Sequence, residues 1–270
     1  MKDLTKLQYD KDFQDKLEEF SKTNFGKETK KILKLIQNGQ IPQSSDFNDK
    51  AWKKLTLLFW EKQDKRCAIC EKDKSKPDGG FGDVEHYRPK SIYWWLAYNP
   101  YNYYLSCFDC NRYFKGDDFP LSDNQSNTVY SDRKNIKNEK PLLLNPILDN
   151  PNDYFQLVFI IHSSTNKGIA ILQSKNGINP SLNQRADKTI EVYNLDLHSY
   201  ENNYRDKARF YLLNDYYNDL FEIAKAKKLK SDREFKGTLL QKVNERPELK
   251  TLGLLRLIIE DQVIINTLTN

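Results

Sequence analysis

The sequence has no long apolar run, and this absence excludes a membrane-spanning helix. Such a helix needs roughly 20 consecutive apolar residues, and no stretch of this chain approaches that length. The first residues, Met1-Lys2-Asp3-Leu4-Thr5-Lys6, also lack the apolar core of a secretory signal peptide. We therefore expect a cytoplasmic protein with no membrane partner.

Apolar residues as a whole are scarce, and the charge of the chain identifies no partner. Only 38% of the 270 residues are hydrophobic, although the aromatic residues, at 13%, bury a large area each. The net charge is +5, but residues 66–120 carry eight basic and eight acidic side chains. A basic run from Lys225 to Lys236 fits either a phosphate backbone or the solvated face of a helix. Charge alone leaves both interpretations open.

Cysteine is rare, and its placement is informative. All four cysteines fall in two CxxC pairs, Cys67-Ala-Ile-Cys70 and Cys107-Phe-Asp-Cys110. Disulfides are disfavoured in a reducing cytosol, and two such pairs are typical of a tetrahedral site with a structural Zn²⁺. A redox role of the thioredoxin type needs only one pair and leaves the second without a purpose. We predict that all four thiolates bind one zinc ion.

The pattern of apolar residues predicts an α+β fold in three parts. Residues 1–65 show helical spacing and would form an N-terminal helical scaffold. Residues 66–121 combine the cysteines with clustered aromatics, and such a small module needs a metal to hold it. Polar residues at 122–139 indicate a linker, and residues 140–270 would form a mostly helical C-terminal region with a β-hairpin. The expected helices are 10–20, 26–37, 46–65, 181–193, 196–228 and 249–268, and the expected strands are 154–161 and 168–173.

Between the cysteine pairs lies a group of residues suited to phosphodiester hydrolysis, which needs a base to activate water and an electrophile to absorb charge. A neutral imidazole serves as the base near pH 7, and His86 offers one. Glu85 and Asn111 supply the oxygen ligands that Mg²⁺ or Mn²⁺ prefers. The Asn102 amide is able to bond backbone groups on both sides and so hold His86 in place.

The spacing of these residues predicts a ββα unit. Sixteen residues separate His86 from Asn102, enough for a strand, a loop and a return strand. Nine more lead to Asn111, enough to turn through the second cysteine pair and enter a helix. Zinc would then fix the strand end relative to the helix and align His86 with the catalytic cation.

These motifs resemble a known family. The order CxxC, Glu85-His86-x-Arg88-Pro89-Lys90, an asparagine and CxxC-Asn111 resembles the HNH, or ββα-metal, endonucleases with a four-cysteine zinc site. Residues 84–90, 97–98 and 107–121 are similar to the PtuB family, the HNH nuclease subunits of Septu-type anti-phage systems, some attached to retrons. The resemblance covers roughly residues 60–210 and is suggestive only in its C-terminal part.

The resemblance implies a role for each residue of the motif. His86 would be the general base and Asn102 the structural asparagine. Asn111 stands where many members have histidine, and Glu85 stands where aspartate is common. The family implies cleavage to 5′-phosphate and 3′-hydroxyl ends and an ABC-type ATPase partner that restrains the nuclease. In a retron setting, a reverse transcriptase and its RNA–DNA product would join them.

Several residues near the motif have two interpretations. Arg88 and Lys90 would hold substrate phosphates, or Arg88 would pair with Glu85 or Asp83. Arg112 and Lys115 are further candidates for phosphate contacts. The aromatic residues would pack in the core or stack on nucleobases; they are Tyr93, Trp94, Trp95, Tyr98, Tyr101, Tyr103 and Tyr104. Without its flanking motif, His86 would be an ordinary hydrogen-bonded histidine. His162 and His198 have no ligand-type residues next to them, and we expect ordinary surface or helix residues there.

Three functions fit these observations. The first is a nuclease effector of an anti-phage system that cleaves DNA, RNA or tRNA, and the second is a stand-alone, restriction-like HNH endonuclease. The third is a zinc-ribbon module that binds nucleic acid without cleaving it. A binding module needs the cysteines but not His86 or Asn111, and a stand-alone enzyme needs a recognition domain that the C-terminal half does not show. The sequence therefore favours the first.

Overall fold

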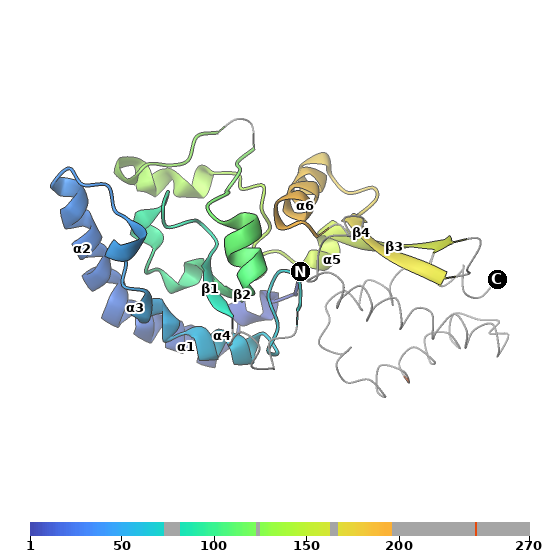
Figure 1. The fold of residues 1–270 in the computed structure, drawn as a ribbon, viewed down its shortest axis with the longest axis horizontal. Helices are drawn as coiled ribbons and strands as arrows, with labels where there is room; N and C mark the ends of the chain where they lie inside the picture. The colour runs from blue at the N-terminus through green and yellow to red at the C-terminus, as the bar shows by residue number, and fades with distance from the viewer. Residues whose placement is uncertain (73–81, 123–124, 163–166, 196–240, 242–270) are drawn as a thin grey trace. The chain divides into compact units, whose positions relative to one another are not determined.

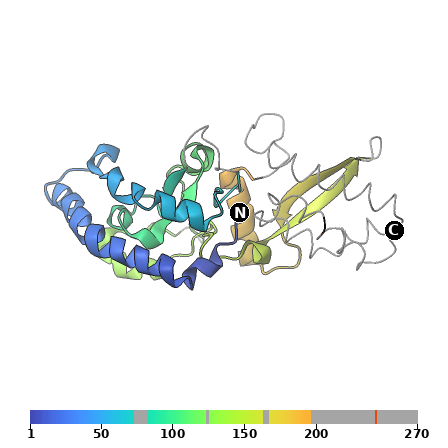
Figure 2. The same ribbon diagram turned by 90° about the horizontal axis from the view of Figure 1, so that it is seen from below.

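The computed structural model describes residues 1–72, 82–122, 125–162, 167–195 and 241. Helices and two small antiparallel sheets alternate along the chain, which confirms the predicted α+β class (Figures 1 and 2). The chain divides into two compact units, one of residues 3–69 and 73–150 and the other mainly of Pro151–Asn270. The expected scaffold helices and most of the 66–121 segment fall in the first of these units, but Cys70–Lys72 are grouped with the second. The three-part division stays a prediction.

The N-terminal helices form as their apolar spacing predicts. Helix α1 (Lys11–Phe20) begins at Asp10, whose side chain accepts a hydrogen bond from the Phe13 amide at 3.0 Å. A π-helical turn (Ser21–Phe25) joins it to α2 (Gly26–Gln37). The predicted helix at 46–65 is broken into α3 (Asp49–Lys53) and α4 (Thr56–Lys62). The periodicity of apolar residues did not reveal this break.

Aromatic side chains connect these helices to the first sheet. The rings of Phe13 and Phe59 meet edge to face with centroids 5.4 Å apart, and Phe20 meets Tyr103 in the same way at 6.3 Å. Such pairs add to the stabilisation that the burial of each ring already provides. Strand β2 (Tyr103–Ser106) therefore packs against α1, which in turn packs against α4.

The first sheet is the predicted hairpin. Strand β1 (Asp83–His86) pairs antiparallel with β2, and the register places Glu85 opposite Tyr104 and His86 opposite Tyr103. The chain then turns through the second cysteine pair into the π-helical segment η6 (Asp109–Lys115). The order strand, strand, helix matches the predicted ββα unit, with a wider helix than the α-helix expected.

Gln63 joins the hairpin to α4, and nothing in the sequence pattern indicated it. Its fully buried amide oxygen accepts from the Leu105 amide at 2.8 Å, and its Nε2 donates to the carbonyls of Leu105 and Arg66 at 3.0 and 3.1 Å. On the outer edge of β2, the Leu105 amide and carbonyl thus bond to this side chain rather than to a third strand, and the carbonyl also accepts from the Ala68 amide.

We expect Gln63→Leu to lower the free energy of unfolding by about 3 kcal/mol, because it leaves the Leu105 amide and the Arg66 carbonyl buried without these partners. Urea titration followed by circular dichroism measures the change. Gln37, exposed at the end of α2, provides the control. Gln37→Leu should stay within about 0.5 kcal/mol of the parent. Equal stability of the two variants would contradict the role given to Gln63.

The segment predicted as a linker carries structure. Residues 130–138 form the 3-10 helix η7 (Tyr130–Asn138), which Glu139 follows. Glu139 accepts hydrogen bonds from the Tyr93 hydroxyl at 3.0 Å and from the Thr128 amide at 2.7 Å, and it pairs with Arg88. Composition indicated polar surface here but did not reveal this anchor.

The second unit contains the predicted β-hairpin. Strand β3 (Phe155–His162) pairs with β4 (Lys167–Ser174), preceded by α5 (Pro151–Tyr154) and followed by α6 (Pro180–Tyr193). Helix α6 begins at Asn179, which accepts from the Ser181 amide, and ends at Asn194 in the left-handed conformation. The helices predicted at 196–228 and 249–268, the basic run and His198 lie outside the described residues.

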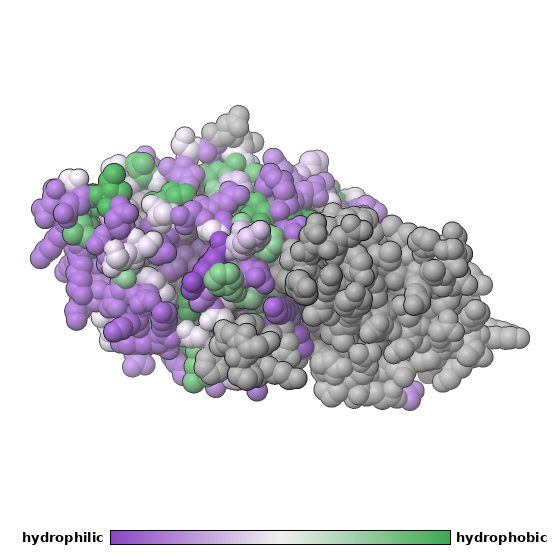
Figure 3. Space-filling model, viewed as in Figure 1, coloured by the Kyte–Doolittle hydropathy of each residue, from purple (hydrophilic) through white to green (hydrophobic). Residues whose placement is uncertain are grey.

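One face of the molecule shows the polar character of the described surface. The face shown in Figure 3 is largely hydrophilic, with apolar residues scattered over it rather than gathered in one broad patch. Within the described ranges, no helix has both the length and the apolar character that crossing a membrane requires.

Candidate active site

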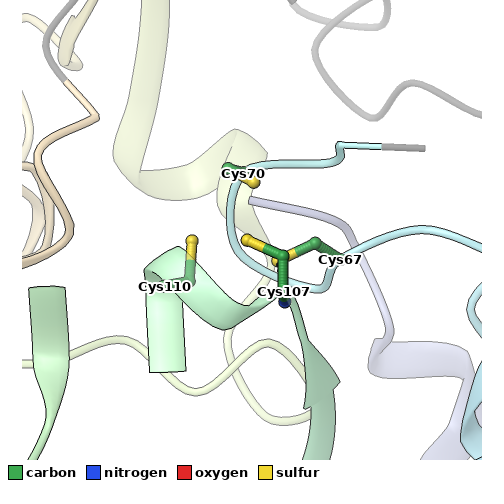
Figure 4. Close-up of side chains that lie close together, drawn as sticks. All are labelled: Cys67, Cys70, Cys107 and Cys110. Carbon is green, nitrogen blue, oxygen red and sulfur yellow. The ribbon is translucent and has the colours of Figure 1, made fainter. Parts of the chain in front are cut away.

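The four cysteines gather at one end of the hairpin. Their sulfur atoms all lie within 4.8 Å of one another, and all four residues are buried (Figure 4). A tetrahedral Zn²⁺ with bonds of about 2.3 Å places its sulfur ligands roughly 3.8 Å apart. The Cys107 amide also donates a hydrogen bond to Cys67 Sγ at 3.2 Å. Four soft donors at this separation fit a zinc ion, so this cluster has the chemistry and the geometry to hold one.

The cluster joins elements that are distant in the sequence. Cys107 directly follows β2, and Cys110 lies in the first turn of η6. The turn of the first pair is tied to β2, because the Ala68 amide donates to the Leu105 carbonyl at 3.0 Å. An ion bound here would fix the start of η6, and with it Asn111, relative to the hairpin.

His86 ends β1 in an aromatic environment that sets its protonation. Its ring meets Trp52 and Tyr103 edge to face, each at a centroid distance of 4.9 Å. Its Nε2 lies 2.8 Å from the Ala97 carbonyl oxygen, and only a protonated Nε2 makes this contact favourable. Burial lowers the pKa of His86 to about 3, although the bond to Ala97 opposes the shift. The imidazole is therefore neutral at pH 7, with Nδ1 left to accept a proton.

Glu85 precedes His86 and has a buried partner. Its Oε1 accepts from the Lys115 ammonium at 2.8 Å, and the carboxylate is only 3% exposed. Burial raises the pKa of Glu85, and the charge and hydrogen bond of Lys115 work against this rise. The other oxygen, Oε2, is buried and has no hydrogen-bond partner among the described residues. A buried carboxylate oxygen without a partner is the kind of atom that a cation satisfies.

A small pocket brings the predicted residues together. Its volume is about 180 Å³. Its lining consists of Glu85, His86, Pro89, Lys90, Asn111, Arg112, Gly116 and Asp117. The proposed base, the buried carboxylate and the second predicted cation ligand thus share one cavity. The pocket also contains an acid that sequence reasoning did not single out as a site residue, Asp117, which directly follows the turn at Gly116.

The donor set of this pocket fits a hard divalent cation. The partnerless Oε2 of Glu85, the amide oxygen of Asn111 and the exposed carboxylate of Asp117 are oxygen donors of the type that Mg²⁺ and Mn²⁺ take. Magnesium is commonly bound through one or two carboxylates together with substrate phosphates. The pocket has two carboxylates and leaves room for a phosphate.

Asn102 makes the two backbone contacts that a clamp requires. Its Oδ1 accepts from the Arg88 amide at 2.8 Å, and its Nδ2 donates to the Arg88 carbonyl at 2.9 Å. The Tyr87 amide adds a bond to the Asn102 carbonyl at 2.8 Å. These bonds hold the chain directly after His86 against the start of β2. The effect on catalysis stays a proposal.

We expect Asn102→Asp to lower the free energy of unfolding by about 2–3 kcal/mol, because a buried carboxylate loses the bond to the Arg88 carbonyl and repels it. Asn99→Asp is the matched control. The Asn99 side chain only accepts a hydrogen bond, from the Tyr101 amide at 3.2 Å, and aspartate performs the same task. Thermal unfolding compares the two variants. A larger loss for Asn99→Asp would contradict the clamp.

Two of the four predicted phosphate contacts have internal partners instead. Arg88 pairs with Glu139 at 2.8 Å, not with Glu85 or Asp83, and lies over the rings of Tyr93 and Phe119. Lys115 is buried against Glu85, so its ammonium is not available to a substrate. Both residues lie in or near the motif in the sequence, but each pairs with a residue far along the chain, Arg88 with Glu139 and Lys115 with Glu85.

The other two basic residues line the pocket. Lys90 is half-buried there, with its ammonium 6.0 Å from the centre of the Phe47 ring. Arg112 is exposed and pairs with Asp83 through two hydrogen bonds, at 3.0 and 3.2 Å. An exposed ion pair contributes little to stability. The Arg112 guanidinium is thus able to exchange Asp83 for a phosphate.

Most of the clustered aromatics pack in the interior. Five are buried, namely Tyr93, Trp95, Tyr98, Tyr103 and Tyr104. Trp94 packs against Tyr130 with centroids 4.5 Å apart, which leaves Tyr101, at 54% exposed, as the member most open to solvent. Packing, the first of the two interpretations, therefore describes most of this group.

Comparison with known proteins gives one informative match. The sequence is 29% identical over 143 residues to the Septu protein PtuB of Bacillus mycoides (strain KBAB4). The chain is similar to a PtuB. The match covers 48% of this chain and 42% of the length of PtuB, so less than half of that protein is represented. No family model matches the sequence, and no solved structure matches it.

Proposed function

We propose that this protein is a metal-dependent HNH endonuclease that hydrolyses phosphodiester bonds. One observation carries the proposal: the pocket is lined both by a histidine whose Nε2 bonds to the Ala97 carbonyl and by a buried carboxylate with one oxygen that has no hydrogen-bond partner among the described residues. General-base hydrolysis at a cation site requires these two features side by side. A zinc-binding module without catalysis requires neither.

In the proposed reaction, His86 Nδ1 accepts a proton from the water that attacks the phosphorus. As the new P–O bond forms, the P–O3′ bond breaks, and the leaving 3′ oxygen takes a proton from solvent to become a hydroxyl. The Ala97 carbonyl fixes the orientation of the ring, and the Asn102 clamp fixes the chain behind it. Glu85, Asn111 and Asp117 would hold the divalent cation, which supplies charge stabilisation on the scissile phosphate when it is bound. Lys90 and Arg112 would attract the flanking phosphates.

The similarity to PtuB supports a place in a Septu-type anti-phage system. An ABC-type ATPase of the PtuA kind would restrain the nuclease, and a reverse transcriptase with its RNA–DNA product would be added in a retron. The equal numbers of acidic and basic residues at 66–120 favour targeting by such a partner, because the module has no excess charge of its own for a polyanion.

Purified, zinc-loaded protein should cleave nucleic acid in the presence of Mg²⁺ or Mn²⁺ and stop when EDTA removes the cation. Duplex DNA, single-stranded DNA, RNA and tRNA are compared by gel electrophoresis, with and without an ABC-type ATPase of the PtuA kind. Cleavage without the ATPase would favour the stand-alone enzyme. Binding to nucleic acid without cleavage under every condition would overturn the proposed activity and favour the zinc-ribbon module.

A further inference from the structure

The Lys115 ammonium is fully buried and donates to three oxygen atoms of residues that line the pocket. These are Glu85 Oε1 at 2.8 Å, the His86 carbonyl at 3.0 Å and the Gly116 carbonyl at 3.3 Å. An ammonium has three hydrogens to donate, so its capacity is used in full. Lys115 therefore contacts the Glu85 side chain and the His86 backbone, and its buried ammonium has no hydrogen left to donate to a substrate.

This contact makes the two oxygens of Glu85 different from each other. Oε1 is held by Lys115, whereas Oε2 is buried, lacks a hydrogen-bond partner among the described residues and belongs to a side chain that lines the pocket. A free carboxylate is able to bind a cation through both oxygens. In this arrangement Glu85 has only one oxygen, Oε2, available to bind the cation.

The ammonium also places a positive charge against the carboxylate that would bind the cation. Like charges at this range repel strongly in a buried site, where the effective dielectric constant is far below that of water. Lys115 should therefore weaken cation binding at Glu85 while it fixes the geometry of the site. A role confined to stabilising the fold has no such opposed effects.

We propose that Lys115 is a positioning residue that restricts Glu85 to ligation of the divalent cation through one oxygen. It lowers the affinity for the cation but keeps Glu85 aligned with His86. Through the His86 carbonyl, the same ammonium fixes the strand end that carries the base. The inference rests on the proposed nuclease function, and its first measurement is independent of nuclease activity.

The test is Lys115→Met in the full, zinc-loaded chain. Isothermal titration with Mn²⁺ in the absence of nucleic acid should show binding roughly tenfold tighter than in the parent, because the repelling charge is gone and both Glu85 oxygens are free. The turnover number should fall by about 100-fold, since an error of about 1 Å in alignment costs that much. Glu85→Gln should abolish the Mn²⁺ signal and so locate it at this pocket.

A loosened fold would lower Mn²⁺ affinity and turnover together, so tighter binding with slower turnover separates positioning from structural support. Mn²⁺ affinity at or below that of the parent, or turnover at the parental rate, would overturn the inference. If Lys115→Met fails to fold by circular dichroism, Lys115→Gln takes its place, because it keeps an N–H donor for the His86 carbonyl. If the parent cleaves nothing, the proposed function fails, and the Mn²⁺ affinities alone decide the role of Lys115.

Discussion

His86→Ala should reduce phosphodiester cleavage by about 10²–10⁴-fold, the range that general-base catalysis contributes. The substitution removes Nδ1, which is the atom proposed to accept the proton. It leaves Glu85, Asn111 and Asp117 in place, so Mn²⁺ binding should persist. The measurement is the rate of cleavage at saturating cation and substrate, together with zinc content and the circular dichroism spectrum.

The variant should also stay folded. The Ala97 carbonyl loses the His86 bond but keeps the one donated by the Tyr103 hydroxyl. The lost ring contacts with Trp52 and Tyr103 leave a cavity that costs about 3 kcal/mol or more. We expect the fold to tolerate this loss if the cysteine cluster binds its zinc ion. His162→Ala, at the end of β3, is the matched control and should cleave at the parental rate. Parental cleavage by His86→Ala, or loss of its zinc and fold, would refute the assignment of the base.

Cys107→Ser should release the zinc ion and destabilise the unit that contains the hairpin. A structural zinc site contributes about 10–16 kcal/mol of binding free energy in small zinc domains, and that energy counts toward folding. Even a loss of about 4 kcal/mol would lower Tm by roughly 10 °C in a chain of this size. Zinc per chain, measured by mass spectrometry of the metal, should fall from about one to near zero.

Phe108→Ser provides the control for this prediction, because Phe108 lies between the two cysteines of the same pair yet is 57% exposed. It should keep its zinc and its Tm. A Cys107→Ser protein that holds a full complement of zinc and melts with the parent would show that the cluster binds no structural ion.

Local patterns in the sequence were sufficient to predict the cysteine cluster and the hairpin that carries the candidate site. The cysteine pairs predict a shared cluster because each CxxC turn brings two sulfurs together, and the distances from His86 to Asn102 and Asn111 leave room for only a short hairpin and a helix. The structure brings the four sulfurs together and places His86 and Asn111 at one pocket. The roles of these residues in catalysis stay a prediction.

Local sequence patterns did not reveal the partners of the charged residues. Lys115 reaches Glu85 across 30 positions, and Arg88 finds Glu139 in a segment whose composition indicated a linker. Gln63 reaches Leu105 across 42 positions. Such contacts depend on how the elements pack, and neither propensity nor periodicity carries that information. Asp117 was missed for a simpler reason: an acid after a glycine at the end of a helix is common on protein surfaces.

The attachment of β2 to Gln63 bears on how this nuclease-like hairpin is built. Both strands have only four residues, and a two-stranded hairpin is marginally stable by itself in water. The Gln63 side chain, directly after α4, bonds to Leu105 on the outer edge of β2, and Phe20 of α1 packs against Tyr103. The proposed base contacts Trp52 of α3. The ββα segment thus depends on residues that precede the first cysteine. A fragment made to test the proposed activity would have to begin at α1 rather than at Cys67.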